Sequence, residues 1–199
     1  MREFILLARK AVTEPFRLND LPGAGRMDLV TRCISNAIFI SEAIRKDVII
    51  YVVLNGPPEP PKTISFDTRY LRRVSPDERN IASHINIALS KGIGLDLEES
   101  IKTEPGIVIS KVSFERLVRE KLEDGYQLIY LTQKGSDIRK FNFSRKVCFV
   151  LGDHRGIPKV TEKFLKKLGV IKLNVGPLEY LSSQCITIVH NILDMFESS

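Results

Sequence analysis

The chain has 199 residues, of which 43% are hydrophobic and 27% charged, fractions typical of a globular protein with one large domain or two small ones. No apolar run approaches the roughly 18 residues that a membrane-spanning helix needs, and the three widely spaced cysteines form neither a metal-binding pattern nor a disulfide framework. We therefore expect a cytoplasmic chain without membrane or metal contacts, and the net charge of +6 favours an anionic partner such as nucleic acid.

The N-terminal third alternates between strand and helix patterns. An apolar strand is expected at residues 4–8, and helical spacing of apolar residues predicts a helix over residues 27–44. The β-branched run at residues 48–54 indicates a buried strand. After the proline-rich surface loop of residues 57–61, alternation of apolar and polar residues predicts an edge strand at residues 62–67.

The clearest helix signal begins at Ser75. The sequence SPDE, residues 75–78, combines an N-cap serine, a proline at the first helical position and a glutamate at the third. This combination forms a capping box. The apolar stripe that follows predicts a helix, and Gly92 is expected to end it.

The remainder of the chain continues the alternation. Strands are expected at residues 107–110, 127–131, 147–151 and 170–175. Helices are expected at residues 114–123 and 159–168, and from Ser182 as N-cap to about Phe196. Strands separated by helices imply an α/β fold with a mostly parallel sheet flanked by helices. The turns after Leu131, Leu151 and Val175 should then meet at the carboxyl edge of the sheet, where such folds bind ligands.

Two glycine-centred turns follow buried strands close together in the chain. The first is VLGDHRG, residues 150–156, and the second is NVGPLEYL, residues 174–181. Each alone is compatible with an ordinary tight turn or strand-to-helix connection. Two such turns at one sheet edge predict a ligand pocket, in which main-chain groups and apolar side chains surround a flat ligand.

The segment LPGAGRMD, residues 21–28, is a second candidate for chemistry. Its backbone amides and Arg26 can bind a phosphate, and Asp28 can accept a proton from a substrate base. The alternative is a flexible loop in which Asp28 only favours the helix dipole.

Other reactive or basic residues are weaker candidates. Cys185, near the start of the last helix, is either an activated nucleophile or a small apolar residue lining a pocket. We favour the second interpretation because no histidine is locally placed to assist the thiol. The basic set Arg69, Arg72 and Arg73 around Tyr70 either meets phosphates or forms a solvated surface.

The last helix is apolar on two sides. One face carries Ile186, Val189 and Leu193, and another carries Ile188 and Ile192. A helix that is apolar on two sides should be covered on two sides. We therefore expect a second subunit, in a homodimer, to cover the outer face.

Several familiar catalytic motifs are absent from the sequence. It contains no GxxxxGK[ST], GxGxxG, HExxH, CxxC or GxSxG. These absences argue against phosphoryl transfer by a P-loop and against zinc-dependent hydrolysis. They also argue against a dehydrogenase-like dinucleotide-binding domain.

Five segments of the chain resemble one known superfamily. They are LPGAGRMDLVTRCISNAIF, LRRVSPDERNIASHINIAL, IYLT, FVLGDHRGIP and VGPLEYLSSQCITIVHNILD, which together extend over nearly the whole chain. They resemble the SPOUT superfamily of S-adenosylmethionine-dependent RNA methyltransferases. Within it, the chain is most similar to the archaeal tRNA pseudouridine-54 N1-methyltransferase family.

The resemblance implies a fold, an assembly and a cofactor site. It implies a single domain over residues 1–199, with a C-terminal trefoil knot in about residues 127–199 through which the last helix is threaded. It also implies a homodimer with that helix at the interface. The S-adenosylmethionine pocket of the family corresponds here to Leu131, Gly152, Val175, Gly176, Pro177, Leu178, Glu179, Tyr180 and Cys185.

The resemblance also implies a reaction, the transfer of a methyl group to N1 of pseudouridine in tRNA without a metal. Asp28 is the candidate catalytic residue, taking or orienting the N1 proton. Arg26, Arg32, Arg69 and Arg72 are the candidate RNA-binding residues. Two alternatives stay open: the same chemistry on a ribosomal-RNA pseudouridine, and an RNA-binding module without catalytic activity.

Overall fold

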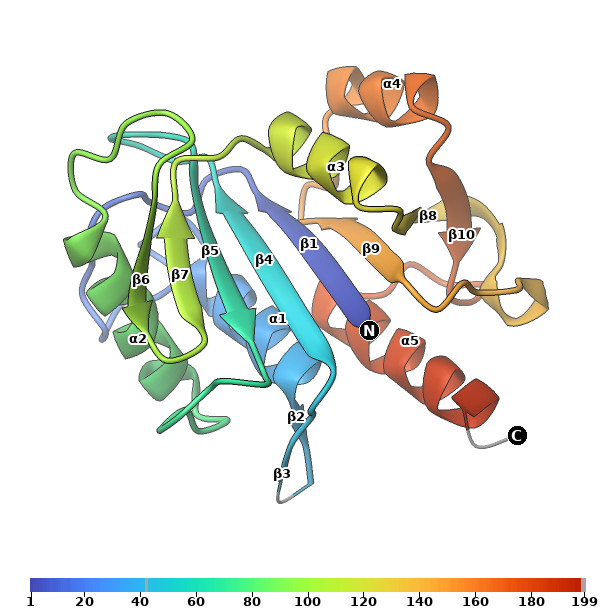
Figure 1. Ribbon diagram of the computed structural model, residues 1–199, viewed down its shortest axis with the longest axis horizontal. Coiled ribbons are helices and arrows are strands. Elements are labelled where there is room, and N and C mark those ends of the chain that lie inside the picture. Colours follow the sequence, from blue (N-terminus) through green and yellow to red (C-terminus); the bar gives the residue numbers. More distant parts are fainter. Residues whose placement is uncertain (42, 198–199) are drawn as a thin grey trace.

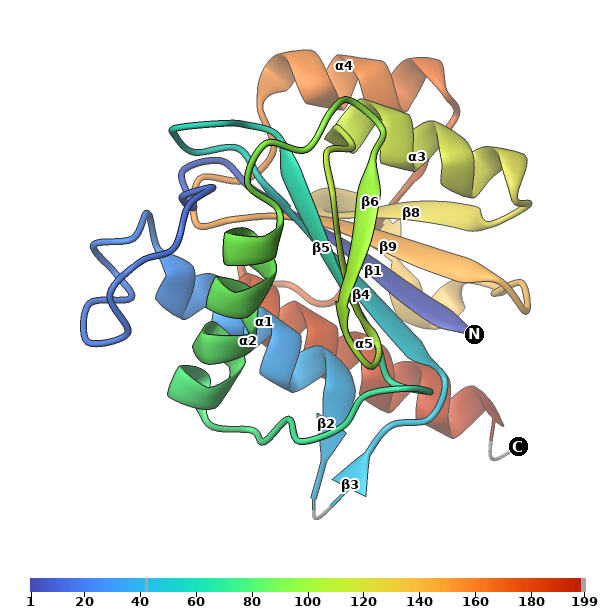
Figure 2. The same ribbon diagram turned by 60° about the vertical axis from the view of Figure 1, so that its left-hand side comes forward.

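The computed structural model describes residues 1–41 and 43–197 and shows one large sheet between two layers of helices. The sheet has eight strands in the order β10-β8-β9-β1-β4-β5-β7-β6. Helices α1, α2 and α5 cover one face, and α3 and α4 cover the other (Figures 1 and 2). The helices are α1 Met27–Ile38, α2 Glu78–Lys91, α3 Phe114–Glu123, α4 Lys159–Lys167 and α5 Ser182–Glu197.

Parallel strands make up the half of the sheet that carries the chain's C-terminal segment. These strands are β10 Ile171–Asn174, β8 Gln127–Asp137, β9 Val147–Gly152, β1 Arg2–Ala8 and β4 Val48–Leu54. The other half is antiparallel and contains β5 Lys62–Asp67, β7 Ile107–Ser110 and β6 Ser100–Glu104. The expected mostly parallel sheet flanked by helices is therefore confirmed.

Both faces of β1 are buried, because helices lie above and below it. Phe4 and Leu6 belong to the core beneath α1, α2 and α5. Ile5 and Leu7 belong to the second core, beneath α3 and α4. A strand that is covered on both faces reads as a continuous apolar run, which is how this segment appears in the sequence.

The first helix is shorter than its apolar pattern predicts. It ends at Ile38, and Phe39 adopts an extended conformation with φ −103° and ψ 147°. Phe39–Ile40 (β2) and Ala43–Ile44 (β3) then pair as short antiparallel strands. The apolar residues that suggested more helix fit an extended chain equally well, because β-branched and aromatic side chains favour strands.

The predicted strand at residues 62–67 is present, but the prediction that it forms the edge of the sheet is wrong. This strand, β5, lies between β4 and β7, and the edge is β6. The sequence of β6, SIKTE, buries only Thr103, so no strand was predicted there. An edge strand needs little apolar surface, and its polar pattern resembles that of a loop.

The predicted N-cap at Ser75 is also wrong. Helix α2 begins at Glu78, and the side chain of Asp77 accepts a 2.8 Å hydrogen bond from the main-chain amide of Asn80. Ser75 lies outside the helix, where its amide donates to Oδ1 of Asn80 at 2.8 Å. The aspartate, two residues later than the serine, is an equally good cap and carries a charge that favours the helix N-terminus. Gly92 ends the helix as predicted.

No helix in residues 1–41 and 43–197 combines the length and the apolar character that crossing a bilayer requires.

Candidate active site

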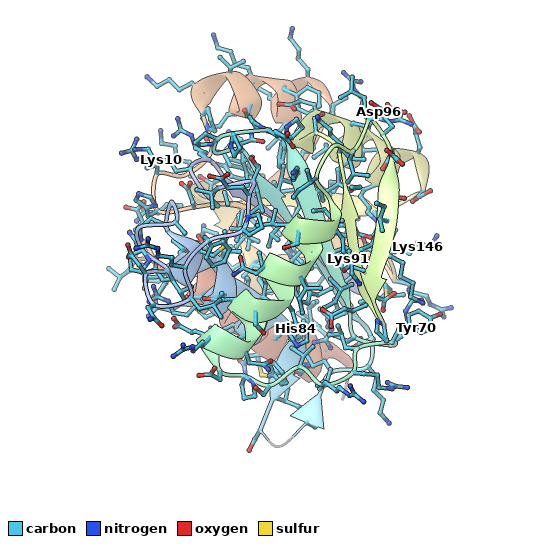
Figure 3. The ribbon with its side chains drawn as sticks, turned by 90° about the vertical axis from the view of Figure 1, so that its left-hand side faces the viewer. Lys10, Tyr70, His84, Lys91, Asp96 and Lys146 are labelled. Carbon is cyan, nitrogen blue, oxygen red and sulfur yellow. The ribbon has the colours of Figure 1, made fainter. Side chains whose placement is uncertain are left out.

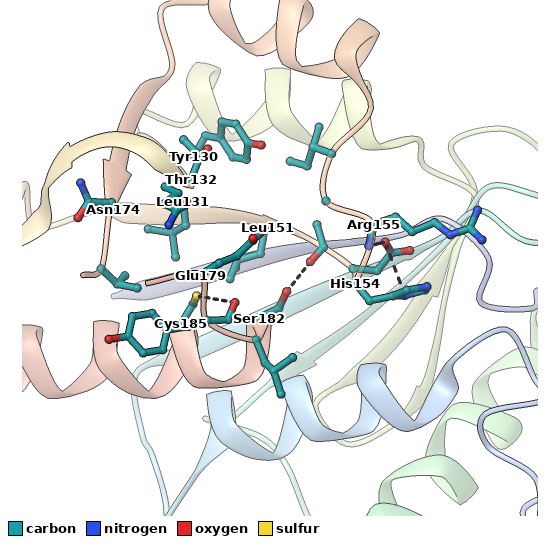
Figure 4. Close-up of a pocket in the computed structure, with 18 of the residues that line it drawn as sticks. Tyr130, Leu131, Thr132, Leu151, His154, Arg155, Asn174, Glu179, Ser182 and Cys185 are labelled. Atoms are coloured by element: carbon teal, nitrogen blue, oxygen red, sulfur yellow. Dashed lines mark hydrogen bonds and ion pairs between the residues drawn. The ribbon is translucent and has the colours of Figure 1, made fainter. Parts of the chain in front are cut away.

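A cavity of about 630 Å³ opens at the carboxyl edge of the parallel strands. Its walls are the middle of β8, the turns that follow β9 and β10, and the start of α5 (Figure 4). The turn predicted after Leu131 is wrong, because β8 continues to Asp137. The predicted residues that line it are Leu131, Gly152, Val175, Gly176, Leu178, Glu179, Tyr180 and Cys185. Pro177 is next to the lining, and its carbonyl accepts a 3.4 Å hydrogen bond from Nε2 of Gln133. The structure therefore brings the two glycine-centred turns together in one pocket.

Asp153 shapes the turn after β9. Its carboxylate is buried and accepts hydrogen bonds of 2.9 Å from the main-chain amides of Arg9 and Arg155. Its own carbonyl accepts a 2.8 Å bond from the amide of Gly156. A β-carbon on Gly152 would lie 2.7 Å from the amide nitrogen of Ile157. The turn itself therefore requires glycine at position 152, in addition to any requirement of a ligand.

The turn after β10 is tied to the turn after β9 through Ser182. Its hydroxyl donates a 2.6 Å hydrogen bond to the carbonyl of Gly152. The predicted N-cap role of Ser182 is wrong, because the amide of Cys185 donates to the carbonyl of Leu181 and Ser182 is already helical. Helix α5 begins at Ser182, and the preceding amide of Leu181 donates to Oε1 of Gln184 at 3.0 Å. Gln184 thus provides the half of a capping box in which a side chain reaches back to the main chain.

Cys185 lines the pocket as a protonated thiol. Burial raises its pKa to about 11. Its sulfur lies 3.8 Å from the carbonyl oxygen of Tyr180, and its side chain packs against the apolar core. A thiol with a raised pKa is a poor nucleophile at neutral pH. This supports the reading of Cys185 as a small apolar lining residue.

Asp28 lies between two arginines at the start of α1. Arg26 binds its carboxylate through two hydrogen bonds of 2.9 and 3.1 Å, and Arg32 adds one of 2.6 Å. The hydrogen bond from Arg26 lowers the pKa of Asp28 most, although partial burial works in the opposite direction. The neighbouring residue, Leu29, lines the pocket. The structure therefore places Asp28, Arg26 and Arg32 together beside the pocket.

Arg69 and Arg72 lie at the opposite end of the parallel strands, where β4 begins. Strand β5 runs antiparallel to β4, and its last residue, Asp67, pairs with Ile49 near the beginning of β4. Arg69 binds Asp67 with hydrogen bonds of 2.9 and 2.6 Å, and Arg72 donates to the carbonyl of Leu71. Figure 3 shows the adjacent Tyr70 far from Lys10, which follows the carboxyl end of β1. Within one chain these two arginines are not brought to the pocket.

Several lining residues were not predicted. They include Leu29, Thr132, Gln133, Lys134 and Asn174. Three of them lie on the extension of β8 beyond Leu131. The signal that the sequence offered was Gly135, because an isolated glycine in a strand marks a close backbone approach. A β-carbon there would lie 2.5 Å from Cα of Leu173, and the carbonyl accepts a 2.5 Å bond from Nδ2 of Asn174.

The chemical character of the pocket combines main-chain groups, apolar side chains and a nearby carboxylate. Its size is within the range of about 300–1,000 Å³ usual for sites that bind small molecules and cofactors. Within the described residues, no group of three or more histidine, cysteine, aspartate or glutamate side chains is placed to hold a metal ion.

Comparison with known proteins agrees with this architecture. Residues 1–198 match the family described as "Putative SAM-dependent RNA methyltransferase". The chain is 45% identical over 199 residues to the tRNA (pseudouridine(54)-N(1))-methyltransferase of Methanocaldococcus jannaschii, with 98% of this chain and 97% of that protein covered. The protein of the same name from Methanosarcina acetivorans is 40% identical over 201 residues, with coverage of 100% and 93%.

A solved structure shares the fold. The crystal structure of Archaeoglobus fulgidus Nep1 bound to S-adenosylhomocysteine aligns with a TM-score of 0.65 and 14% identity, and the alignment covers 99% of each chain. The family match over residues 1–198 and the relatives at 40–45% identity confirm the family resemblance seen in the sequence motifs. From its first residue to residue 198, the chain belongs to the family of S-adenosylmethionine-dependent RNA methyltransferases.

Proposed function

We propose that this protein methylates N1 of pseudouridine at position 54 of tRNA with S-adenosylmethionine as the methyl donor. The observation that carries the proposal is the placement of Asp28, held by two arginines, beside a pocket formed by β8 and the turns after β9 and β10. The full-length identity to archaeal enzymes named for this reaction supports the choice of base and RNA.

The proposed cofactor site is the pocket itself, and we infer that it belongs to a single domain over residues 1–199. Leu131, Gly152, the segment of residues 175–180 and Cys185 are the residues proposed to hold S-adenosylmethionine. The fit is supported by Gly176, which has no side chain on this wall and would meet the Tyr180 ring at 3.1 Å if it had a β-carbon. When bound, S-adenosylmethionine supplies an activated methyl group.

Asp28 is proposed to act on the proton at N1 of the target base. Pseudouridine carries an N1–H at the position where uridine presents a C–H, so only pseudouridine can donate a hydrogen bond there. The lowered pKa keeps Asp28 ionised at neutral pH, and the two arginines fix the direction of its oxygens. An ionised, oriented carboxylate can hold this proton and take it as the methyl bond forms.

Arg26 and Arg32 are proposed to bind RNA phosphate or the target base while they hold Asp28. Their side chains are 39% and 41% exposed, so they can reach a second anion from the solvent side. Arg69 and Arg72 are also proposed to bind RNA. Because they lie at the opposite end of the parallel strands, they would contact nucleotides distant from the reacting base.

The finer architecture is also a proposal. We infer a C-terminal trefoil knot within about residues 127–199, supported by the bond between Ser182 and Gly152 and by the close approach of Gly135 to Leu173. We infer a homodimer that uses α5, because Phe196 near its end is 51% exposed. The site of action would be the cytoplasm, where tRNA is processed.

The test is transfer of a labelled methyl group to defined RNAs. Two tRNA transcripts, one with pseudouridine and one with uridine at position 54, are compared with a ribosomal-RNA fragment that contains pseudouridine. The proposal predicts label only in the pseudouridine-containing tRNA. Label only in the ribosomal fragment would assign the other substrate, and no label despite bound S-adenosylhomocysteine would indicate a non-catalytic module.

A further inference from the structure

Three basic residues lie on two segments beside one end of the pocket, which Arg155 lines. Arg9 and Lys10 follow the carboxyl end of β1, and Arg155 lies in the turn after β9. The carboxylate of Asp153 joins these two segments, since it accepts 2.9 Å bonds from the amides of both Arg9 and Arg155. Figure 4 shows Arg155 at the end of the pocket away from Asn174. We call Arg9, Lys10 and Arg155 the mouth cluster.

The main chain at Lys10 packs closely against two glycines. A β-carbon on Gly25 would lie 2.5 Å from the carbonyl carbon of Lys10, and one on Gly56 would lie 2.7 Å from the same atom. The loops that contain these glycines therefore pack directly against Lys10. The amide of Val12 also donates to the carbonyl of Ala24 at 3.3 Å. The main chain that carries Lys10 is thus fixed by packing and hydrogen bonds to the neighbouring loops.

The side-chain charges of the mouth cluster are not neutralised by ion pairs. Among the residues that the structure describes, no carboxylate lies within 4.0 Å of the side-chain nitrogens of Arg9, Lys10 or Arg155. Other arginines of the chain behave differently, since Arg26 binds Asp28 and Arg69 binds Asp67. The acidic group nearest to the cluster, Asp153, is buried and directs its oxygens to main-chain amides.

In the proposed reaction, an anionic part of the substrate must lie next to the mouth cluster. A base that enters a pocket has to leave its stack, and the phosphates on either side of its nucleotide then stand at the entrance. Lysine and arginine side chains are the usual partners of backbone phosphates. We propose that the mouth cluster binds the RNA phosphates that flank the target nucleotide. The identity of the anion as RNA rests on the proposed function.

The test is the salt dependence of RNA binding by Lys10→Ala, Arg155→Ala and the double variant. A pseudouridine-containing tRNA stem-loop is titrated in the presence of S-adenosylhomocysteine, between about 50 and 200 mM salt. Each phosphate contact that is lost should lower the slope of log K against log salt concentration by about 0.7 to 0.9. The double variant should lose about twice that amount, and Arg155→Lys should retain the wild-type slope.

A matched control is Lys167→Ala. Lys167 is exposed in the last turn of α4, just before β10 begins and therefore away from the carboxyl ends of the strands. This variant should bind the RNA as wild type does. Calorimetry with S-adenosylhomocysteine checks that the pocket of each variant is intact. An unchanged slope in both Lys10→Ala and Arg155→Ala would overturn the inference, as would absence of RNA binding by the wild type.

Failure of the inference can be told apart from failure of the proposed function. If the wild type binds the RNA but transfers no methyl group, the proposed function fails, and a reduced slope in the variants still supports the mouth cluster. If the wild type methylates the RNA and the variants keep its slope, only the mouth cluster is overturned.

Discussion

The hydroxyl of Ser182 donates a 2.6 Å hydrogen bond to the main-chain carbonyl of Gly152. This bond joins the start of α5 to the end of β9, two walls of the same pocket. The two residues are 30 positions apart in the chain. The bond therefore fixes the relative position of the two turns proposed to hold the cofactor.

We predict that Ser182→Ala lowers the affinity for S-adenosylhomocysteine. A typical hydrogen bond contributes about 0.5–1.5 kcal/mol, which corresponds to a loss of about 2- to 10-fold. Isothermal titration calorimetry measures this change. The matched control is Ser90→Ala in α2, whose hydroxyl also donates to a main-chain carbonyl, that of Asn86 at 2.8 Å. Equal affinities in the two variants would show that the bond does not organise the pocket.

Gly152→Ala should disturb the fold of the turn as well as the pocket. The new β-carbon would meet the backbone of Gly156 and Ile157, which cannot move without opening the turn. Overpacking of this kind typically costs about 1–3 kcal/mol, so both the melting temperature and the cofactor affinity should fall. Gly176→Ala is the comparison, because the atoms nearest to its β-carbon would belong to the Tyr180 side chain, at 3.1 Å or more. A melting temperature for Gly152→Ala at or above that of Gly176→Ala would refute the described turn.

Asp28→Asn should slow methyl transfer without weakening cofactor binding. Removal of a positioned proton acceptor typically costs about 10²- to 10⁴-fold in rate. Asp28 does not line the pocket, so the affinity for S-adenosylhomocysteine should be unchanged. Single-turnover assays on the pseudouridine-containing tRNA give the rate, with Asp124→Asn beyond the end of α3 as the control. An undiminished rate would remove Asp28 from the mechanism.

The stability of the protein should depend on pH through His190. Its Nε2 donates a 2.9 Å bond to the carbonyl of Ala37, and burial lowers its pKa to about 3. As the pH falls below about 6.5, the unfolded chain binds a proton that the folded protein does not. The contribution of neutral His190 to the free energy of unfolding is therefore complete above pH 6.5. It is lost as the pH falls toward 3, by up to about 1.4 kcal/mol per pH unit.

Urea denaturation between about pH 4.5 and 7 tests this dependence on His190. Asp194 has a pKa lowered to about 2, mainly by its hydrogen bond from Arg45, so its contribution is lost only below this window, as the pH falls through about 4. In His190→Gln the amide can still donate to Ala37, and the decline in stability should flatten. The same decline in wild type and variant would exclude His190 as its source.

Much of the fold follows from periodicity that the sequence displays. The strand Val48–Leu54 and the helix Phe114–Glu123 have the predicted bounds, because their patterns are long and unambiguous. The polar strand β6 and the β2–β3 pair were missed, since neither has a pattern that distinguishes it from a loop or a helix. Element boundaries depend on tertiary contacts that local patterns do not contain.

The site was predictable to the extent that glycines mark it. Gly152 and Gly176 identified the two turns because turns of this kind need residues without side chains. The roles of Asp153 and Ser182 were not predictable, because the partners of Asp153 include Arg9, 144 residues away, and Ser182 bonds to Gly152. Hydrogen bonds between distant segments appear only once the sheet order is known.

The most direct test of the account is mass spectrometry of tRNA nucleosides after incubation with the protein and S-adenosylmethionine. The substrate is a tRNA that carries pseudouridine at position 54, and the same tRNA with uridine there is the control. The account predicts one added methyl group, located at N1 of pseudouridine 54, and none in the control. A methyl group on any other atom or nucleotide, or equal methylation of the control, would contradict it.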